Sequence, residues 1–309
     1  MGKSLLFFAS LPFISIIVLL NQNNSFENPS LIHQTIVKSK VADEPKCSDC
    51  HGDMLENKTK HPPAAESCEA CHQVNIKEHT EAGAKGLQLS DKLPDLCFTC
   101  HDGVKTVVDS AKFLHLALKT EKTCVACHSP HSSAEDKLLR KEEKKLCLSC
   151  HNKDKTAKGE KSVNINSLLA KSKVIHPPVE GGCLVCHRPH ASDKDYLLIK
   201  SFPRGFYASA EKETFALCWE CHDSELLKAE KTTTATNFRN GDKNLHFVHV
   251  NGEKSRSCVM CHNVHASNNL HLIEDKIAYG QWNLPLKYKA KENGGSCFPG
   301  CHAMKEYIR

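Results

Sequence analysis

All 18 cysteines of this 309-residue chain occur in pairs, and a histidine directly follows each pair. Eight pairs have the spacing Cys-x-x-Cys-His, namely Cys47, Cys50 and His51; Cys68, Cys71 and His72; Cys97, Cys100 and His101; Cys124, Cys127 and His128; Cys147, Cys150 and His151; Cys183, Cys186 and His187; Cys218, Cys221 and His222; and Cys258, Cys261 and His262. In the ninth pair three residues separate Cys297 from Cys301, and His302 follows. Thiols and imidazoles at such spacing are suited to metal ligation or to covalent attachment of a cofactor.

Two kinds of site use closely spaced cysteines. A structural zinc site takes Cys-x-x-Cys as part of its ligand set and has no need of histidine at the next position. In the second kind, two thiols on one helical turn form thioethers to a haem, and the next histidine ligates the iron. Only 20 of the 309 residues are histidine, so chance does not explain one after every pair. The sequence therefore predicts nine covalently bound haem c groups, eight at regular motifs and one at the stretched motif.

The second axial ligands must come from the remaining histidines. Nine of the 20 histidines follow cysteine pairs, and 11 remain. Eight of these recur ahead of or behind the motifs and are predicted distal ligands: His61, His79, His115, His131, His176, His190, His249 and His265. The distal ligand of the ninth iron is His33, His246 or His271. The two of these histidines that do not ligate iron are expected to be solvent-exposed. The four methionines do not fit the pattern, so we expect bis-histidine iron with low reduction potentials.

The motifs form an internal repeat. After a solitary motif at 47–51, a leading histidine, a motif, a trailing histidine and a second motif recur four times, at about 61–101, 115–151, 176–222 and 249–302. In the last three copies the trailing histidine stands three positions after the motif histidine, about one helical turn further on. It cannot reach the same iron, so we expect it to ligate a different haem.

The elements that position these residues are expected to be small. With only 12 Phe, 5 Tyr and 2 Trp, the chain has too few large apolar side chains for an ordinary core of this length. We therefore expect a mainly irregular fold with short α-helices and no substantial sheet, in which stacked haems form the core. Composition favours helix at 104–118, 133–146 and 208–228, and exposed loops at 152–173 and 229–244. The His-Pro-Pro sequences at His61 and His176 favour extended backbone there.

The N-terminus is typical of an export signal. Lys3 precedes an apolar run over 5–20, and we expect cleavage near Asn24. The run contains Pro12 and holds 16 residues, fewer than the roughly 20 that a membrane-spanning helix needs. An uncleaved membrane anchor is the alternative. Residues 25–46 then form an arm and 47–309 a single multihaem domain. Export fits thioether attachment, which takes place outside the cytoplasm; we expect a periplasmic protein, with outer-membrane association or an extracellular location as alternatives.

The net charge depends on the cofactors. The formal charge of the sequence is +5. Each of nine haems adds two negative propionates and one positive charge at the ferric porphyrin core, so the net charge of the haem protein becomes −4. Full reduction removes one positive charge per haem, which gives −13. The 41 Lys and Arg residues are therefore read as solvating and propionate-neutralising, and no nucleic-acid partner is expected.

The stretches CVACHSPHSSAEDKLLRKEEKKLCLSCH and CLVCHRPHASDKDYLLIK resemble the multihaem c-type cytochromes with doubled Cys-x-x-Cys-His motifs, similar to the decahaem periplasmic conduit cytochromes of metal-reducing bacteria. The resemblance covers about residues 47–302. It implies a wire-like row of haems that moves electrons across the periplasm, through an outer-membrane porin or to extracellular acceptors. Its redox partners would be a membrane quinol dehydrogenase on one side and a terminal acceptor or outer-membrane conduit on the other. Nine sites, a stretched last motif and a looser first repeat depart from the decahaem pattern.

The sequence is consistent with three functions. The leading interpretation is an electron-transfer protein that is not an enzyme. The second is a multihaem reductase or oxidase of a small nitrogen or sulfur compound, whose open haem would be sought at the stretched motif and His302. The third is a homo-oligomer or extracellular filament in which His33 of one subunit ligates a haem of the next.

Overall fold

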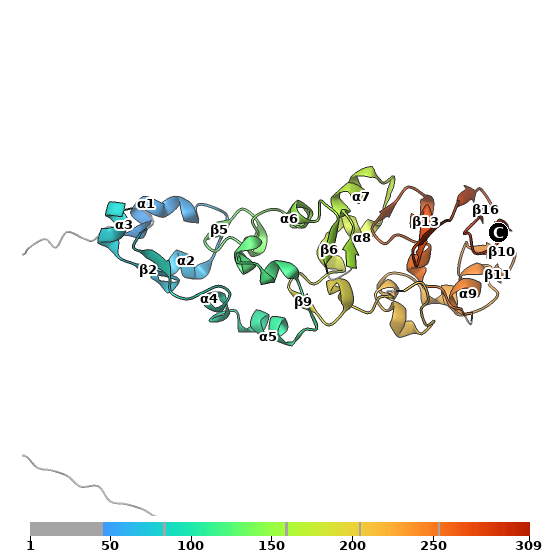
Figure 1. Ribbon diagram of the computed structural model, residues 1–309, viewed down its shortest axis with the longest axis horizontal. Coiled ribbons are helices and arrows are strands. Elements are labelled where there is room, and N and C mark those ends of the chain that lie inside the picture. The colour runs from blue at the N-terminus through green and yellow to red at the C-terminus, as the bar shows by residue number, and fades with distance from the viewer. Residues whose placement is uncertain (1–45, 83–84, 158–159, 204, 253) are drawn as a thin grey trace, which may run out of the picture. The chain divides into compact units, whose positions relative to one another are not determined.

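The computed structural model describes residues 46–82, 85–157, 160–203, 205–252 and 254–309. The predicted export signal (1–24), His33 and nearly all of the predicted arm (25–46) lie outside these ranges. Residues 46–309 cluster as one unit. Its elements succeed one another in roughly the order of the chain (Figure 1).

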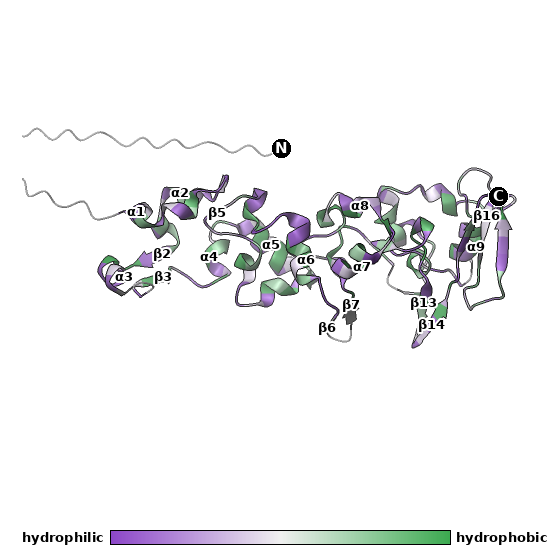
Figure 2. Ribbon diagram, turned by 90° about the horizontal axis from the view of Figure 1, so that it is seen from above, coloured by the Kyte–Doolittle hydropathy of each residue, from purple (hydrophilic) through white to green (hydrophobic). Residues whose placement is uncertain are grey.

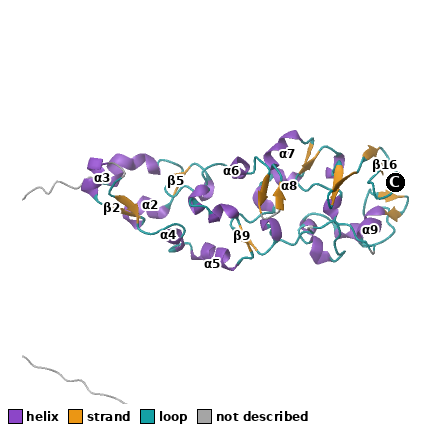
Figure 3. Cartoon of the chain, in the orientation of Figure 1, coloured by secondary structure: helices purple, strands orange, loops and turns teal. Residues whose placement is uncertain are grey.

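The helices of the described chain are short. The longest has nine residues. They are α1 (Cys47–His51), α2 (Pro62–Glu66), α3 (Ile76–Ala82), α4 (Asp95–Phe98), α5 (Asp102–Ser110), α6 (Glu143–Cys150), α7 (Ile165–Lys171), α8 (Pro177–Glu180) and α9 (Leu245–Val250), with many single 3-10 turns between them. Figure 3 shows these helices separated by long irregular segments. None of the described helices is long and apolar enough to cross a membrane.

Most strands are short and form local hairpins. These hairpins join β2 (His72–Val74) to β3 (Leu87–Leu89), β6 (Lys155–Ala157) to β7 (Glu160–Ser162), β10 (Arg239–Asn240) to β11 (Lys243–Asn244), and β13 (Lys276–Tyr279) to β14 (Trp282–Pro285). Close to the C-terminus, β15 (Lys289–Lys291), β16 (Gly294–Cys297) and β17 (Lys305–Ile308) form an antiparallel sheet, the largest in the described chain. The predicted fold class, mainly irregular with short helices and no substantial sheet, is confirmed.

Three further ladders join residues far apart in the chain, and all three are built alike. They pair β1 (Thr59–Lys60) with β5 (Ser132–Ser133), β4 (Phe113–Leu114) with β9 (Ala191–Ser192), and β8 (Val174–Ile175) with β12 (Ala266–Ser267), all antiparallel. In each, the strand just ahead of a leading histidine pairs with the strand just behind the trailing histidine of the next repeat. These three connections, called here the inter-repeat ladders, fix each repeat to its neighbour.

Buried apolar side chains are sparse, as the composition predicts. Within the described ranges, those that are fully buried all lie from Ala191 onward. Six of them form two small clusters, one of Phe215, Leu227 and Val250 and the other of Met260, Ile277 and Leu286. Figure 2 shows apolar and polar segments alternating along the unit without a consolidated apolar interior. The polypeptide of residues 46–190 therefore does not supply a conventional core.

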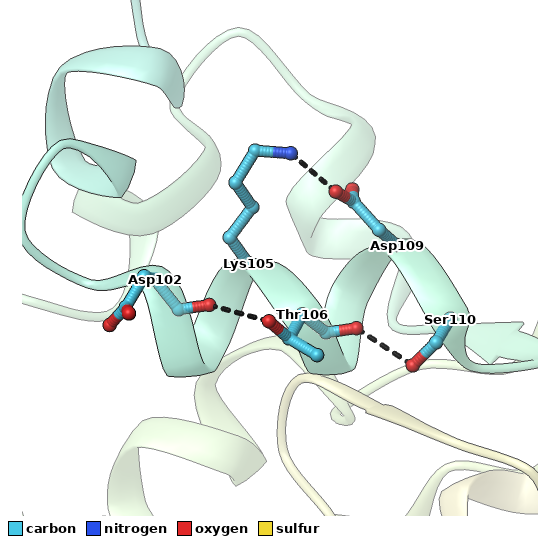
Figure 4. A network of polar contacts seen from close by, with 5 residues as sticks. All are labelled: Asp102, Lys105, Thr106, Asp109 and Ser110. Atoms are coloured by element: carbon cyan, nitrogen blue, oxygen red, sulfur yellow. Dashed lines mark hydrogen bonds and ion pairs between the residues drawn. The ribbon is translucent and has the colours of Figure 1, made fainter. Parts of the chain in front are cut away.

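Several element predictions need correction. The helix predicted at 104–118 is α5, which ends at Ser110 because Phe113 and Leu114 are drawn into the ladder with β9. The i,i+4 pairs of α5 are Lys105 with Asp109, Thr106 with the Asp102 carbonyl (3.0 Å) and Ser110 with the Thr106 carbonyl (2.7 Å), all on its exposed surface (Figure 4).

The other predicted helices and loops also differ. At 133–146 only α6 is α-helical, and it begins at Glu143, where the Glu142 carboxylate accepts from the backbone N–H groups of the first turn. Residues 208–228 form separate 3-10 turns rather than a helix. The predicted loop at 152–173 contains the β6–β7 hairpin and α7, and the one at 229–244 contains β10 and β11. His61 and His176 are extended as predicted (ψ 119° and 123°), but the prolines after them begin α2 and α8.

Candidate haem sites

Each of the eight regular motifs lies on a single helical turn. Motifs one, three and five lie in or at the end of α1, α4 and α6, and the other five form 3-10 turns that begin at or just before the first cysteine. In the second motif, for example, the Cys71 N–H donates to the Cys68 carbonyl at 3.2 Å. Such a turn carries both thiols and the following histidine within a few ångströms, which thioether attachment requires.

The ninth motif is built differently. Cys297 is the last residue of β16, and the chain reverses before β17 begins at Lys305. Gly300 has φ +73°, a conformation that favours glycine, and a Cβ there would lie 3.3 Å from the Leu284 side chain. The thiols of this motif are therefore presented by a strand and a turn.

Three proximal histidines are oriented by a repeated backbone turn. The Nδ1–H groups of His128, His187 and His262 donate to the carbonyls of Lys137 (2.8 Å), Tyr196 (2.9 Å) and His271 (2.8 Å). These carbonyl residues and the leucine after each have φ between +55° and +59°. With Nδ1 engaged, the free Nε2 is the nitrogen that can reach a metal, the usual arrangement of a ligating histidine.

A serine holds each of these turns in place. The Oγ atoms of Ser133, Ser192 and Ser267 donate to the carbonyls of Leu139, Leu198 (2.6 Å) and Ile273. The same oxygens accept from backbone N–H groups two residues later, at 3.0, 3.0 and 3.1 Å. This explains why each of the last three repeats continues from its trailing histidine to a serine and then to a pair of aliphatic residues. The helix does not continue through the trailing histidine.

Eight motif histidines face a second histidine across a constant gap. The ring centres lie 5.9–6.5 Å apart, with interplanar angles of 8–40°. The pairs are His51 with His79, His72 with His131, His101 with His61, His128 with His190, His151 with His115, His187 with His265, His222 with His176, and His262 with His246.

This gap suits an iron between two imidazoles. If each ligating nitrogen is about 2 Å from the metal and roughly 1 Å from its own ring centre, the two centres lie about 6 Å apart. The residues therefore fit haem at eight motifs, where these histidines would be the axial ligands. Among the described residues, no three His, Cys, Asp or Glu side chains converge to hold a metal ion of their own.

The pairing follows the repeats. Each trailing histidine of the last three repeats faces the proximal histidine two motifs earlier, so it lies opposite a different motif, as expected. Each leading histidine of the first three repeats faces the proximal histidine of the second motif in its own repeat. The inter-repeat ladders position both the leading and the trailing histidines. The backbone N–H of His61 donates to the His131 carbonyl (2.8 Å), and that of His176 donates to the His265 carbonyl (2.9 Å).

The three histidines that compete for the ninth place are not equivalent. His246 is half-buried and its ring faces His262 at 6.5 Å. Burial, with His262 and His249 nearby, lowers the pKa of His246 to about 4, which keeps the imidazole neutral, the form that ligates metal. His271 is exposed and supplies the backbone carbonyl that orients His262. Aligning the repeats places His271 with Lys137 and Tyr196, and this signal in the sequence could have excluded it.

His249 has no such partner. Its ring stacks on Phe238 at 5.7 Å, and no histidine ring of the described chain faces it at the distance that the eight pairs share. His302 is near enough to lower the pKa of His249, after the larger effect of burial. The described residues at the ninth motif thus fit a bis-histidine haem less well than those at the other eight.

Neighbouring motifs are in contact along the chain. The Cys47 side chain lies next to that of Cys68, Cys97 next to Cys124, Cys147 next to Cys183, and Cys218 next to Cys258. Between these contacts, Cys127 lies near Cys150, Cys186 near Cys221, and Cys261 near Cys297. Burial and the neighbouring thiolates raise the pKa of Cys97 to about 11 and that of Cys261 to about 12.

The same motifs define the relatives of the chain. Residues 61–106, 115–156 and 176–226 match the family described as Doubled CXXCH motif. Three segments of the chain thus carry the doubled motif, and the chain is a multihaem c-type cytochrome. This cytochrome is also 32% identical over 131 residues to the multiheme cytochrome MtrA of Shewanella baltica (strain OS185), an alignment that covers 40% of the chain. The chain spans about a third of the length of that curated relative, 36%. Covalently bound haem is thus the cofactor of the doubled motifs.

Proposed function

We propose that this cytochrome binds nine haems in a row and carries electrons along it. Each cysteine pair would hold one haem and the following histidine would be its proximal ligand. The eight facing histidines would complete the coordination of eight irons, with His246 serving the iron of His262. The observation that carries the proposal is the shared separation of 5.9–6.5 Å between eight pairs of imidazole rings.

The contacts between motifs support a row that follows the sequence. Thioether sulfurs lie at the edge of the porphyrin, so cysteines that touch bring porphyrin edges together. Adjacent cysteines connect motifs one and two, three and four, five and six, and seven and eight. These contacts cross the boundaries between repeats. The row would therefore pass through all four repeats as one path.

The residues favour electron transfer over substrate chemistry. When bound, haem supplies one-electron exchange at the iron, and a second histidine leaves that iron no position for a substrate. Because eight motif histidines of the described chain face a second histidine, the potentials are expected to be low. The repeated serine-held turns would keep the imidazoles rigid, so coordination does not change when the charge on the iron changes.

The position of this cytochrome in a cell follows as part of the proposal. We expect an exported protein, periplasmic or attached to the outer membrane. It would take electrons from a membrane quinol dehydrogenase and deliver them to a terminal acceptor or outer-membrane conduit. The likeness to a multihaem cytochrome supports redox partners of this kind.

The test is redox titration of the exported protein, with haem counted by pyridine haemochrome and by intact mass. We expect nine haems per chain, potentials clearly below those of His/Met cytochromes c, and low-spin ferric signals from at least eight haems. Fewer than nine haems, or several high-spin centres, would contradict the proposal. A carrier without an enzymatic role would exchange electrons with strong reductants but show no steady turnover of nitrite, hydroxylamine or sulfite.

A further inference from the structure

The ninth motif differs from the fourth, sixth and eighth motifs at its proximal histidine. His302 is exposed, and its Nδ1–H donates at 2.6 Å to the carbonyl of the next residue, Ala303. In the fourth, sixth and eighth motifs the acceptor is instead a carbonyl nine residues further on, within a turn that a buried or half-buried serine holds. The orientation of the His302 ring is therefore set only by its own short loop.

The candidate distal histidine of this site is also presented differently. His61, His115 and His176 are extended residues at the N-terminal end of a helical turn, each bonded to an inter-repeat ladder. His249 instead lies in the last turn of α9. The place of the next repeat is taken by β17, whose Ile308 carbonyl accepts from the Gly241 N–H at 2.8 Å.

Packing fixes the ring of His249 where it is. Its Nδ1–H donates to the Leu245 carbonyl at 2.6 Å, one turn back in α9, and Phe238 stacks on the ring at an interplanar angle of 24°. Phe238 in turn meets the buried Tyr307 edge-on at 5.1 Å. A shift of His249 toward His302 would disturb all of these contacts. The eight other pairs need no such shift.

We propose that His249 and His302 do not form a closed axial pair, so that the iron held by His302 has one position open to a small neutral diatomic ligand of ferrous haem. The inference rests on the proposed binding of nine haems. The haem of the ninth motif would then bind an exogenous ligand as well as exchange electrons.

The test uses carbon monoxide as the probe on the fully reduced, exported protein. Titration followed by haem absorbance should show one carbon monoxide bound per chain, and the oxidised protein should show one high-spin haem. The double variant Cys297→Ala with Cys301→Ala should lose one haem by mass and with it all carbon monoxide binding. No carbon monoxide binding by a wild-type chain that carries nine haems would overturn the inference.

Two matched variants localise the open position. His246→Ala removes the ring that faces His262 and should raise binding from one carbon monoxide per chain to two. His249→Ala should leave the count at one, because its ring does not close the ninth site. If the wild type instead binds none and His249→Ala binds one, the pair is closed and the inference fails.

The proposed function and this inference fail in different measurements. A chain that carries eight haems by mass has no ninth site, which contradicts the nine-haem proposal before any ligand is added. A chain with nine haems, all low spin and unreactive toward carbon monoxide, keeps the proposed function and rejects the inference alone.

Discussion

At the scale of single residues, the chain orients five of its paired histidines through their Nδ1 atoms. A backbone carbonyl accepts from Nδ1 of His61, His128, His176, His187 and His262, at 2.8–2.9 Å. This bond sets the tautomer and the plane of the ring before a metal is considered. Removal of one ring should therefore open one coordination position without moving its neighbours.

The variant His131→Ala tests whether removal of one facing ring opens one coordination position. The variant removes the ring that faces His72 and should add one high-spin haem and one carbon monoxide site per chain relative to wild type. Electron paramagnetic resonance and ligand titration provide the measurement. His271→Ala is the control, because that exposed side chain faces no motif and its backbone carbonyl is kept, so its spectrum should match wild type. Equal effects of both variants would refute the pairing.

The attachment sites could be predicted from the sequence because their residues are contiguous, whereas the pairing of histidines could not. His72 and His131 are far apart in the chain, and only the inter-repeat ladders bring the two sides of such a pair together. The facing of His246 and His262 likewise depends on tertiary packing, whereas alignment of the repeats is enough to exclude His271. Short helices were misplaced because tertiary pairing overrides local composition, as where the ladder with β9 ends α5 at Ser110.

At the scale of elements, the same serine-held turn is used three times. Each turn places two successive residues in the left-handed region, which costs non-glycine residues free energy, and a serine side chain satisfies the carbonyl that follows. Ser133 and Ser267 are buried, so their hydroxyls cannot exchange these partners for water. The turns should therefore be sensitive to loss of the hydroxyl.

Ser267→Ala should destabilise the protein by about 1–3 kcal/mol, because it leaves the Ile273 carbonyl and the Asn269 N–H without their partner. Denaturant titration followed by haem absorbance measures the change. Ser110→Ala is the matched control, since that hydroxyl lies on the exposed surface of α5 (Figure 4) and should change stability by less than about 0.5 kcal/mol. A stability change of similar size in both variants would mean that the hydrogen bonds of Ser267 to its turn contribute no specific stability.

At the scale of the whole molecule, covalent attachments replace a hydrophobic core. The described chain has only two small apolar clusters, both toward its C-terminal end. Repeats joined only to their neighbours behave as an array whose stability is approximately a sum of local terms. The cofactors also decide the surface charge, because each haem adds two propionates to a sequence whose formal charge is +5.

The charge can be tested by ion exchange at pH 7. Although the sequence pI is about 8.3, the mature oxidised protein should bind an anion exchanger, and reduction should delay its elution because each iron loses a positive charge. The same polypeptide made without haem attachment should pass through the column. Flow-through of the mature protein in both redox states would show that the haems are fewer than proposed or that their propionates are neutralised.

The inter-repeat ladders have a consequence for how such a gene can lengthen. Each ladder joins a repeat only to the next one, with two residues on each side. Duplication of an internal repeat would therefore insert two motifs and recreate one ladder without altering the existing ones. Chains that grow in this way keep the parity of their motif count. The odd total here corresponds to the one motif, at Cys47, that stands outside the four repeats.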